Sequence, residues 1–308
     1  MNFSGETKVR AKIDQRELNL TNLDKVFWPR EGYTKGELLH YYAEISPYLL
    51  PHLQDRPIVL VRHPDGVEGE SFYQKETPEY APNWVKTAAI HHSGDKMVHY
   101  TICNDQATLL WMVNQGAIEI HPWFSRWQKD DYPDIMVLDI DPEPPSGFDD
   151  VLLLALAIRE VLKRYGLEAF PKTSGATGLH VFVPIAPDHT YPEVARAAGY
   201  VASLVAKAFP EKATVERMVK KRGGKVYLDF LQNLRGKTVV AVYSPRPRPL
   251  APVSMPITWE EVAEGKVRPT DFTIKNGLER VKKTGDLLAP MLTMRQDLRR
   301  LMESAGRG

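Results

Sequence analysis

Residues 135–141 read Ile-Met-Val-Leu-Asp-Ile-Asp and are followed by Pro142. The apolar run predicts a buried strand that ends at the two acids, because proline cannot continue a central strand. Asp139 and Asp141 are two residues apart, so both side chains leave one face while Ile140 points to the core. Adjacent carboxylates repel unless a cation compensates, and Mg²⁺ or Mn²⁺ prefers carboxylate oxygens. The alternative is an exposed strand end whose acids cap the next helix.

The segments after this strand predict a mixed sheet backed by helices. Strands and helices alternate without a regular βαβ order, which indicates an α+β fold. Strands are expected at 169–173, 179–185, 226–231 and 238–243, and helices at about 148–165 and from Thr190 to Pro210. The Pro-rich stretch 244–256 is expected to run extended along the surface. A short helix is expected after Thr258, followed by helical packing from about 271.

The N-terminal part predicts a second set of elements. Thr34 and Glu37 form a capping box that starts a helix over about 35–50, and Asn104 is expected to cap a helix over about 104–118. Short strands are expected at 58–62, 72–75 and 97–103. We therefore expect one domain with an N-terminal lobe at about 20–128, a catalytic lobe at about 129–256 and a helical tail at about 257–308.

Composition limits the class of protein. The chain has 308 residues, 43% hydrophobic and 26% charged, as in ordinary globular proteins. A single cysteine, Cys103, excludes an internal disulfide and a Cys-based zinc site. No apolar run approaches the roughly 18 residues of a membrane span, so a cytoplasmic protein is expected.

Charge is distributed unevenly along the chain. Residues 130–150 hold eight acids and no base, whereas residues 217–248 hold nine bases against Asp229 alone. A cation-binding and an anion-binding segment in one chain suit phosphate chemistry. Two solvated charged faces are the alternative.

Asp229 is an acid inside the apolar run 226–231. A buried carboxylate needs a metal or a basic partner, and a salt bridge to a nearby base is the alternative explanation. If Asp229 meets Asp139 and Asp141, the three can hold two cations about 4 Å apart, one activating a 3′-hydroxyl and one bridging a triphosphate.

The segment Ser174-Gly-Ala-Thr-Gly-Leu-His180 lies between two expected strands. Its glycines let the backbone approach an anion, Ser174 and Thr177 add hydroxyls, and His180 can donate to a phosphate. A plain turn with a core histidine explains the same residues. Arg246 and Arg248 add rigidly held guanidinium groups for a triphosphate, or serve only solubility.

Cations also lie next to aromatic residues in the N-terminal part. The combination predicts stacking of bases and contact with a nucleic-acid backbone by Arg62, Phe72, Tyr73 and Lys75. The alternative is that Phe72 is an ordinary core residue. Lys25 and Lys35 flank a helix start and predict a pocket for a terminal phosphate, although two lysines near a loop are common.

Nine blocks in this order resemble the polymerase domain of bacterial DNA ligase D, a branch of the archaeo-eukaryotic primase superfamily. They are Asn22–Pro29, Thr34–Lys35, Arg56–Pro57, Phe72–Lys75, Ala117–His121, Asp139–Pro142, Thr173–His180, Lys225–Asn233 and Ala241–Ser244. The resemblance implies a primase-polymerase fold with two mixed or antiparallel sheets flanked by helices and an RRM-like catalytic lobe.

The resemblance also implies a function. It indicates a template-directed nucleotidyltransferase that extends DNA ends and fills gaps in non-homologous end joining. Such an enzyme prefers ribonucleotides and is guided by a downstream 5′-phosphate. The implied partners are DNA, nucleoside triphosphates, a separate ligase and Ku at the nucleoid. No Lys-x-Asp-Gly ligase motif occurs in the chain, which suggests a stand-alone protein.

Roles follow residue by residue from the resemblance. Asp139, Asp141 and Asp229 match the ligands of two Mn²⁺ or Mg²⁺ ions, with no zinc. The incoming nucleotide is assigned to His121 at the sugar and to Ser174, Gly175, Thr177, Gly178, His180 and Arg246. The 5′-phosphate is assigned to Asn22, Lys25 and Lys35, and the DNA to Arg62, Phe72, Tyr73, Lys75 and Arg222. Thr177 and Val61 stand where many relatives carry basic residues.

Three other functions remain possible at this point. A primase would start chains without a primer, a two-metal nuclease or phosphatase would also use three acids, and a binding module would need none of them.

Overall fold

A computed structural model describes residues 8–92 and 96–306 of the chain, which folds as two units. Unit 1 takes the chain up to Trp123 together with Val240–Ser254 and Phe272–Gly285. Unit 2 takes Phe124–Val239, Met255–Asp271 and the chain from Asp286 on. This division differs from the predicted lobes, because the segment after Val239 belongs to unit 1, where Ala241 donates a backbone hydrogen bond of 2.8 Å to Ile120.

Unit 2 is built on a five-stranded sheet. Its strands, in spatial order, are β11 (Phe170–Thr173), β12 (Leu179–Pro184), β10 (Ile135–Asp141), β14 (Val226–Asp229) and β13 (Ala213–Thr214). All neighbours are antiparallel except β13 and β14. The predicted strand 135–141 is therefore the central strand, and the predicted mixed sheet is confirmed.

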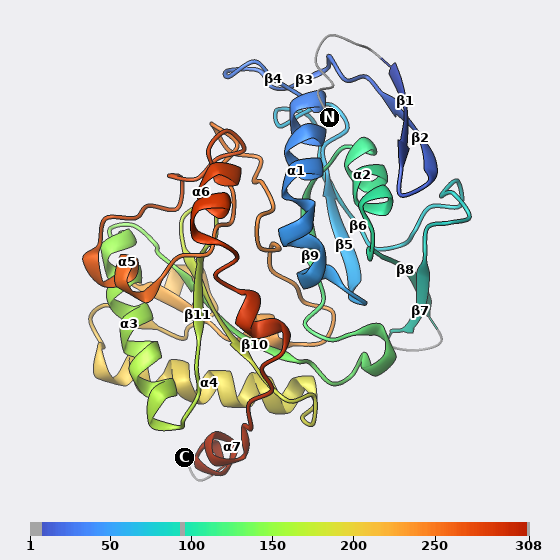
Figure 1. Cartoon of the computed structure of the whole chain (residues 1–308). Helices are drawn as coiled ribbons and strands as arrows, with labels where there is room; N and C mark the ends of the chain where they lie inside the picture. The colour runs from blue at the N-terminus through green and yellow to red at the C-terminus, as the bar shows by residue number, and fades with distance from the viewer. Residues whose placement is uncertain (1–7, 93–95, 307–308) are drawn as a thin grey trace. The chain divides into compact units, whose positions relative to one another are not determined.

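Two long helices pack on β10 (Figure 1). They are α3 (Phe148–Arg164) and α4 (Tyr191–Ala208), and α4 starts after Thr190 as predicted, where Thr190 N donates to Glu193 Oε2 at 2.7 Å. Ile140, which alternates with the two acids, is fully buried, as the strand period requires. The remaining elements of unit 2 are η1 (Trp127–Lys129), η2 (Val219–Lys221), η3 (Leu231–Asn233), α5 (Trp259–Glu264), η4 (Ala289–Leu292) and α7 (Arg299–Ala305).

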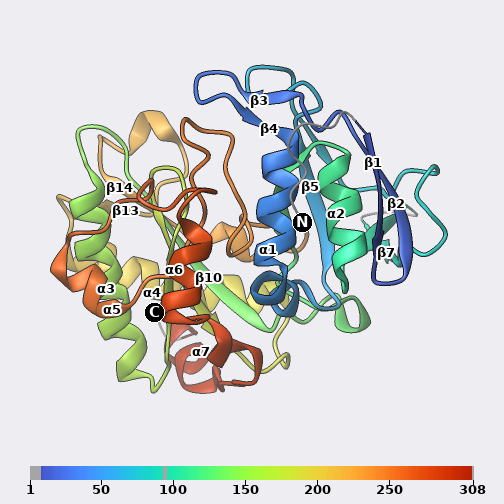
Figure 2. The same cartoon turned by 45° about the horizontal axis from the view of Figure 1, so that its top comes forward.

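Unit 1 contains a second five-stranded sheet. The strands run in the order β6 (Phe72–Gln74), β5 (Pro57–Arg62), β8 (Met97–Ile102) and β7 (Thr87–His91), and β9 (Ala117–Pro122) also pairs with β5. Helices α1 (Lys35–Leu53) and α2 (Gln106–Asn114) lie side by side (Figure 2), and α6 (Gly277–Thr284) packs on α1. Two hairpins complete the unit: β1 (Lys8–Ile13) with β2 (Arg16–Thr21), and β3 (Val26–Trp28) with β4 (Tyr33–Thr34).

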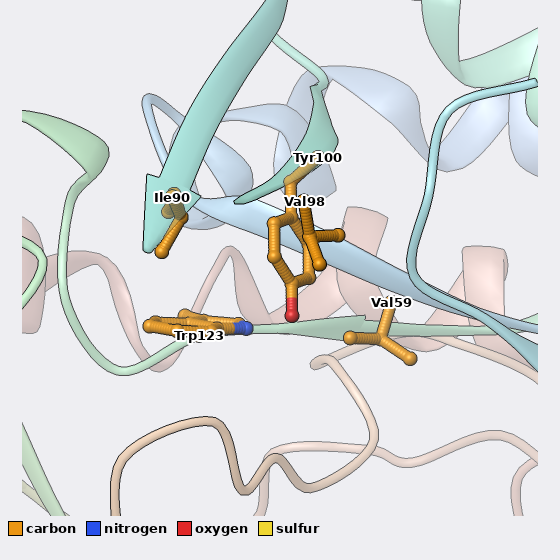
Figure 3. Packing of buried hydrophobic residues seen from close by; sticks show 5 residues of the cluster. All are labelled: Val59, Ile90, Val98, Tyr100 and Trp123. Carbon is orange, nitrogen blue, oxygen red and sulfur yellow. The ribbon is translucent and has the colours of Figure 1, made fainter. Parts of the chain in front are cut away.

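An aromatic cluster fills part of the core of unit 1 (Figure 3). Tyr100 and Trp123 meet edge to face with ring centroids 5.3 Å apart, and Val59, Ile90 and Val98 pack around them. This edge-to-face geometry is the one that aromatic pairs prefer in cores.

The predicted helix over 104–118 is wrong at both ends. The cap is Asp105, whose side chain accepts from Thr108 N at 2.7 Å, while Asn104 is held by hydrogen bonds to Asp55. Gly116 has a φ of +84°, which ends the helical path and lets the chain enter β9.

Two predictions near the end of unit 1 are also wrong. Residues 238–243, all of them described, form no strand, and the chain turns at Tyr243 with a φ of +63°. The Pro-rich stretch does not stay on the surface, since Ser254 and Met255 are buried. The backbone of Met255 is held by Thr173, whose N–H donates to it at 2.9 Å. Residues 93–95, where the sequence Ser-Gly-Asp favours a turn, lie outside the described residues. No described helix is long and apolar enough to span a membrane.

Candidate active site

Four polar residues form one row across the sheet of unit 2. The register pairs Asp139 with Asp229 on one side and with His180 on the other, and it pairs His180 with Lys172. Directly opposite residues in antiparallel strands project from the same face. Asp141 lies two residues along β10 and leaves that face as well. The sheet therefore brings the three acids predicted from the sequence to one face.

His180 connects Asp139 to a buried lysine. Its Nε2 lies 3.2 Å from Asp139 Oδ1, and its Nδ1 lies 2.7 Å from Lys172 Nζ. When Lys172 is an ammonium, which only donates, Nδ1 accepts and the ring hydrogen lies on Nε2, facing the carboxylate. Lys172 has no exposed surface, and its Nζ lies 5.2 Å from the ring centroid of Phe182.

Asp229 is held by its own surroundings. Its Oδ1 accepts from Leu231 N at 2.8 Å and from the hydroxyl of Tyr227 at 3.2 Å, and its Oδ2 accepts from Gln232 Nε2 at 3.0 Å. Among the described residues, neutral donors therefore hold Asp229, in place of the alternative salt bridge to a nearby base. Burial, together with the charge of Asp229, raises the pKa of Tyr227 to about 12. With the carboxylate in this orientation, the described residues hold no group of three or more His, Cys, Asp or Glu side chains arranged around a metal position.

The glycine loop is pinned against the end of β10. A Cβ on Gly178 would lie 2.2 Å from Ile140 O, so only glycine fits there. The Oγ of Ser174 accepts from Ala176 N at 3.1 Å and from Gly178 N at 3.0 Å. The backbone N–H groups of Ala176 and Gly178 therefore point to Ser174 and not to an anion. Gly175 takes a φ of +70°, and Thr177 is exposed at the tip.

Arg222 lies next to this row. Its guanidinium carbon is 3.9 Å from the ring centroid of Tyr227, the neighbour of Asp229 on the same face of β14, and it donates to the carbonyls of Glu216 and Arg217. These contacts hold an arginine of the basic segment close to the acids.

Unit 1 carries the other predicted nucleotide residues. Glu119 joins His121 to Arg246: its Oε2 lies 2.7 Å from His121 Nε2 and its Oε1 accepts from Arg246 Nε at 3.0 Å. Burial raises the pKa of Glu119, but the hydrogen bond from His121 and the charge of Arg246 outweigh it, so the pKa lies below its ordinary value. The ring of Tyr73 meets His121 edge-on, with centroids 6.2 Å apart.

The aromatic residues of β6 are exposed, which excludes the core alternative for Phe72. Phe72 and Tyr73 are 45% and 68% exposed, and Tyr80, which the sequence analysis missed, is 61% exposed. Arg62 lies 5.2 Å from the ring centroid of Phe72 and donates to the hydroxyl of Tyr80 at 3.3 Å. Lys75 follows β6 and is exposed.

A cavity of about 220 Å³ in unit 1 collects the predicted phosphate residues. Lys35, the first residue of α1, is buried and donates to Thr21 O at 2.6 Å. Burial, with the charges of Lys25 and Arg62, lowers the pKa of Lys35 from 10.5 to about 8. Lys25 donates to Pro64 O and to Asp65. The lining comprises Thr21, Asn22, Lys25, Phe27, Lys35, Arg62, Pro64, Asn114, Gln115 and Gly116.

The family of the LigD primase-polymerase domain matches residues 34–288. The chain belongs to this family. A LigD primase-polymerase domain is a nucleotidyltransferase. The row of acids across the sheet therefore belongs to an enzyme.

Relatives and a solved structure agree with this placement. The bifunctional non-homologous end joining protein LigD of Bacillus subtilis is 36% identical over 270 residues, covering 87% of this chain and 43% of that protein. The multifunctional LigD of Mycolicibacterium smegmatis is 34% identical, covering 89% of this chain and 36% of that protein. The chain thus spans less than half the length of these curated relatives. The polymerase domain of Mycobacterium tuberculosis ligase D in complex with DNA superposes with a TM-score of 0.84 at 31% identity, covering 92% of this chain and 100% of that one.

Besides Tyr80, two charged residues of this LigD-family chain were not predicted from the sequence, Lys172 and Glu119. Lys172 lies in an apolar strand, and its position two residues before the Ser174 loop is the only signal. Glu119 lies two residues before His121 on β9, so the strand period could have placed both side chains on one face.

Proposed function

We propose that this chain is a metal-dependent, template-directed nucleotidyltransferase that extends DNA ends and fills gaps during non-homologous end joining. It prefers ribonucleotides and is guided by a downstream 5′-phosphate. The observation that carries the proposal is the register of Asp139 with Asp229, with Asp141 on the same face. The relatives, which are non-homologous end joining proteins, and the DNA complex of the matching structure support the reaction and its setting.

The three acids are proposed as the ligands of two divalent ions. Carboxylate oxygens suit Mn²⁺ or Mg²⁺, which, when bound, supplies the charge neutralisation that phosphoryl transfer needs. Asp229 serves as a ligand by turning its carboxylate away from Gln232. His180 presents its Nε2–H next to Asp139, as a donor for a phosphate oxygen, and Ser174 holds the loop that precedes it. Gly175 and Gly178 shape this loop, and Thr177 lies at its tip.

Unit 1 carries further residues that we assign to nucleotide binding. His121 contacts the sugar and accounts for the ribonucleotide preference, and Arg246 contacts the phosphates. Glu119 fixes both side chains, because one buried carboxylate accepts from each of them.

Other residues bind DNA. The cavity with Lys25 and Lys35 takes the 5′-phosphate, and Asn22 shapes its rim with a φ of +56°. Phe72 and Tyr73 stack on template bases, while the neighbouring cations Arg62 and Lys75, and Arg222 of unit 2, contact the backbone. We further propose a separate ligase and Ku as partners at the nucleoid.

The test is incorporation on a gapped duplex with and without the downstream 5′-phosphate, using each kind of nucleotide. We expect ribonucleotides to be favoured and the phosphate to stimulate incorporation. Asp139→Ala should abolish incorporation while DNA binding is kept. Cleavage or phosphate release without synthesis would instead identify a nuclease or phosphatase, and dinucleotide formation on an unprimed template a primase.

A further inference from the structure

The outer face of the β1–β2 hairpin carries a row of basic side chains. Lys8, Arg10 and Lys12 alternate along β1 and are all exposed, and we name these three residues the basic face. The residues on the opposite face of the hairpin are buried, among them Ala11 and Ile13 from β1 and Leu18 and Leu20 from β2. The hairpin is thereby fixed in place, so its charges have a defined direction.

The basic face has an excess of positive charge. The register sets Lys8 opposite Thr21, Arg10 opposite Asn19 and Lys12 opposite Glu17. Glu17 is the one acid on the outer face of these two strands, and it is in an ion pair with Arg10. Asp14, in the turn, caps α2 by accepting from Ala107 N at 3.1 Å. Lys8 and Lys12 therefore remain as two uncompensated charges within the hairpin.

The same hairpin borders the cavity that contains Lys35. Thr21, the partner of Lys8, lines the cavity and accepts from Lys35 Nζ at 2.6 Å. Asn114 of α2 also lines it, accepting from Thr21 N at 3.0 Å and donating to Asn19 O at 3.0 Å. Figures 1 and 2 both show the hairpin beside α2. The basic face thus begins at the cavity and runs away from it.

We propose that the basic face binds the phosphate backbone of the duplex downstream of the gap, continuing from the 5′-phosphate cavity. This inference rests on the proposed function. A strand rises about 3.3 Å per residue, so Lys8 and Lys12 are about 13 Å apart, the length of about four base-pair steps. Lysines on flexible stems bind phosphates without reading sequence, which suits an enzyme that acts on any broken end. The cationic cavity at one end favours a polyanion over an acidic protein.

The test compares two variants with the same change in charge. Lys8→Gln/Lys12→Gln removes the uncompensated lysines and leaves the Arg10–Glu17 pair. Lys282→Gln/Lys283→Gln is the control, since both of these lysines are exposed on α6 of the same unit. The affinity for gapped duplexes is measured as a function of salt concentration. The first linkages of the downstream arm are either ordinary phosphates or uncharged methylphosphonates. Each duplex is used with and without the 5′-phosphate.

We expect the hairpin variant to lower the slope of log affinity against log salt by about 2 on the ordinary arm, because each lost phosphate contact contributes about 0.9. On the uncharged arm the hairpin variant should bind as the wild type does, and the α6 variant should follow the wild type on both arms. Equal slopes for the hairpin variant and wild type on the ordinary arm, or the same loss on both arms, would overturn the inference. If the 5′-phosphate did not raise the affinity of the wild type, the assignment of the cavity to this phosphate would be refuted. The comparison of the ordinary with the uncharged arm would still test the basic face.

Discussion

Asp139 on β10 and Asp229 on β14 are direct antiparallel partners, although they come from distant parts of the chain. Partners of this kind have Cα atoms about 5 Å apart and side chains on the same face. Two carboxylates so close are unfavourable unless they share a cation or hydrogen-bond donors. His180 faces Asp139, and Gln232 and Leu231 N serve Asp229. Among the described residues, Asp229 is held by the neutral donors Tyr227, Leu231 N and Gln232, which a cation can displace.

Lys172→Met tests the role of the buried lysine. Methionine has a similar volume and removes the cost of burying an ammonium, so the variant keeps the packing while it loses the Nζ donor. Without the Nζ donor, His180 loses the contact that keeps its hydrogen on Nε2. We expect kcat to fall about tenfold or more with little change in the KM for DNA, because roughly 1.4 kcal/mol of transition-state stabilisation corresponds to a factor of ten.

The ¹⁵N chemical shifts of the His180 ring report the tautomer directly. They should show a hydrogen on Nε2 in the wild type and a mixture in Lys172→Met. An unchanged ring spectrum together with unchanged kcat would refute the positioning role, whereas a purely structural role would lower stability and leave the tautomer alone.

Gly178→Ala should prevent the loop from closing against β10. The added Cβ would lie 2.2 Å from Ile140 O, a backbone atom that cannot move without disturbing Asp139 and Asp141. We expect a loss of about 1–3 kcal/mol of unfolding free energy, as for other overpacked sites, and strongly reduced incorporation. Gly147→Ala is the control, because nothing lies within 4 Å of its Cβ position. Denaturant unfolding of both variants checks this, and similar losses would contradict the steric account.

Glu119→Gln should weaken discrimination between ribonucleotides and deoxyribonucleotides. The amide cannot accept from His121 and Arg246 with both of its heavy atoms, so one of these side chains loses its fixed position. We expect the ratio of kcat/KM for the two nucleotides to fall about tenfold, the effect of roughly 1.4 kcal/mol. Asp105→Asn, which alters another carboxylate of unit 1 paired with an arginine, should leave the ratio unchanged. If the ratio of kcat/KM for ribonucleotides and deoxyribonucleotides were unchanged in Glu119→Gln, Glu119 would have no role in sugar selection.

Lys35 should make binding of the 5′-phosphate depend on pH. Its pKa of about 8 in the folded protein lies below 10.5, so the charged form is disfavoured on folding. The unfolded chain then binds more protons between about pH 8 and 10.5, and the contribution of Lys35 to stability rises with pH across that window. The preference for phosphorylated over unphosphorylated DNA should fall from pH 7 to 9 as Lys35 loses its charge. Lys35→Met should lack the pH dependence, and a wild-type preference that stays constant would contradict the assignment.

Local rules predicted much of unit 2. The two-residue period placed Asp139 and Asp141 on one face, and the capping boxes at Thr34 and Thr190 start helices as expected. The pairing of β10 with β14 could not be derived, because register between distant strands depends on the packing of the whole sheet. Lys172 was missed for the same reason, since its partner His180 lies on the next strand.

Other differences have local causes. Asp229 was expected to need a metal or a base, but hydrogen-bond donors next to it in the chain satisfy its carboxylate. The turn after β14 brings Leu231 N and Gln232 to this carboxylate. Arg62 was assigned to the template, and the structure also places it in the cavity with Lys35 because β5 ends there. The first two residues of β9 fell inside the helix predicted over 104–118, and the sequence did not predict the strands β1 to β4 and β7.

The most direct measurement is titration of Mn²⁺ into the wild type and into Asp139→Asn, Asp141→Asn and Asp229→Asn, followed by calorimetry. If the three acids share the ions, each substitution should weaken Mn²⁺ binding by about tenfold or more, in line with the loss of a charged ligand. If Asp229→Asn bound Mn²⁺ as tightly as the wild type while the other two did not, Asp229 would be no ligand, and the proposed three-acid site would be wrong.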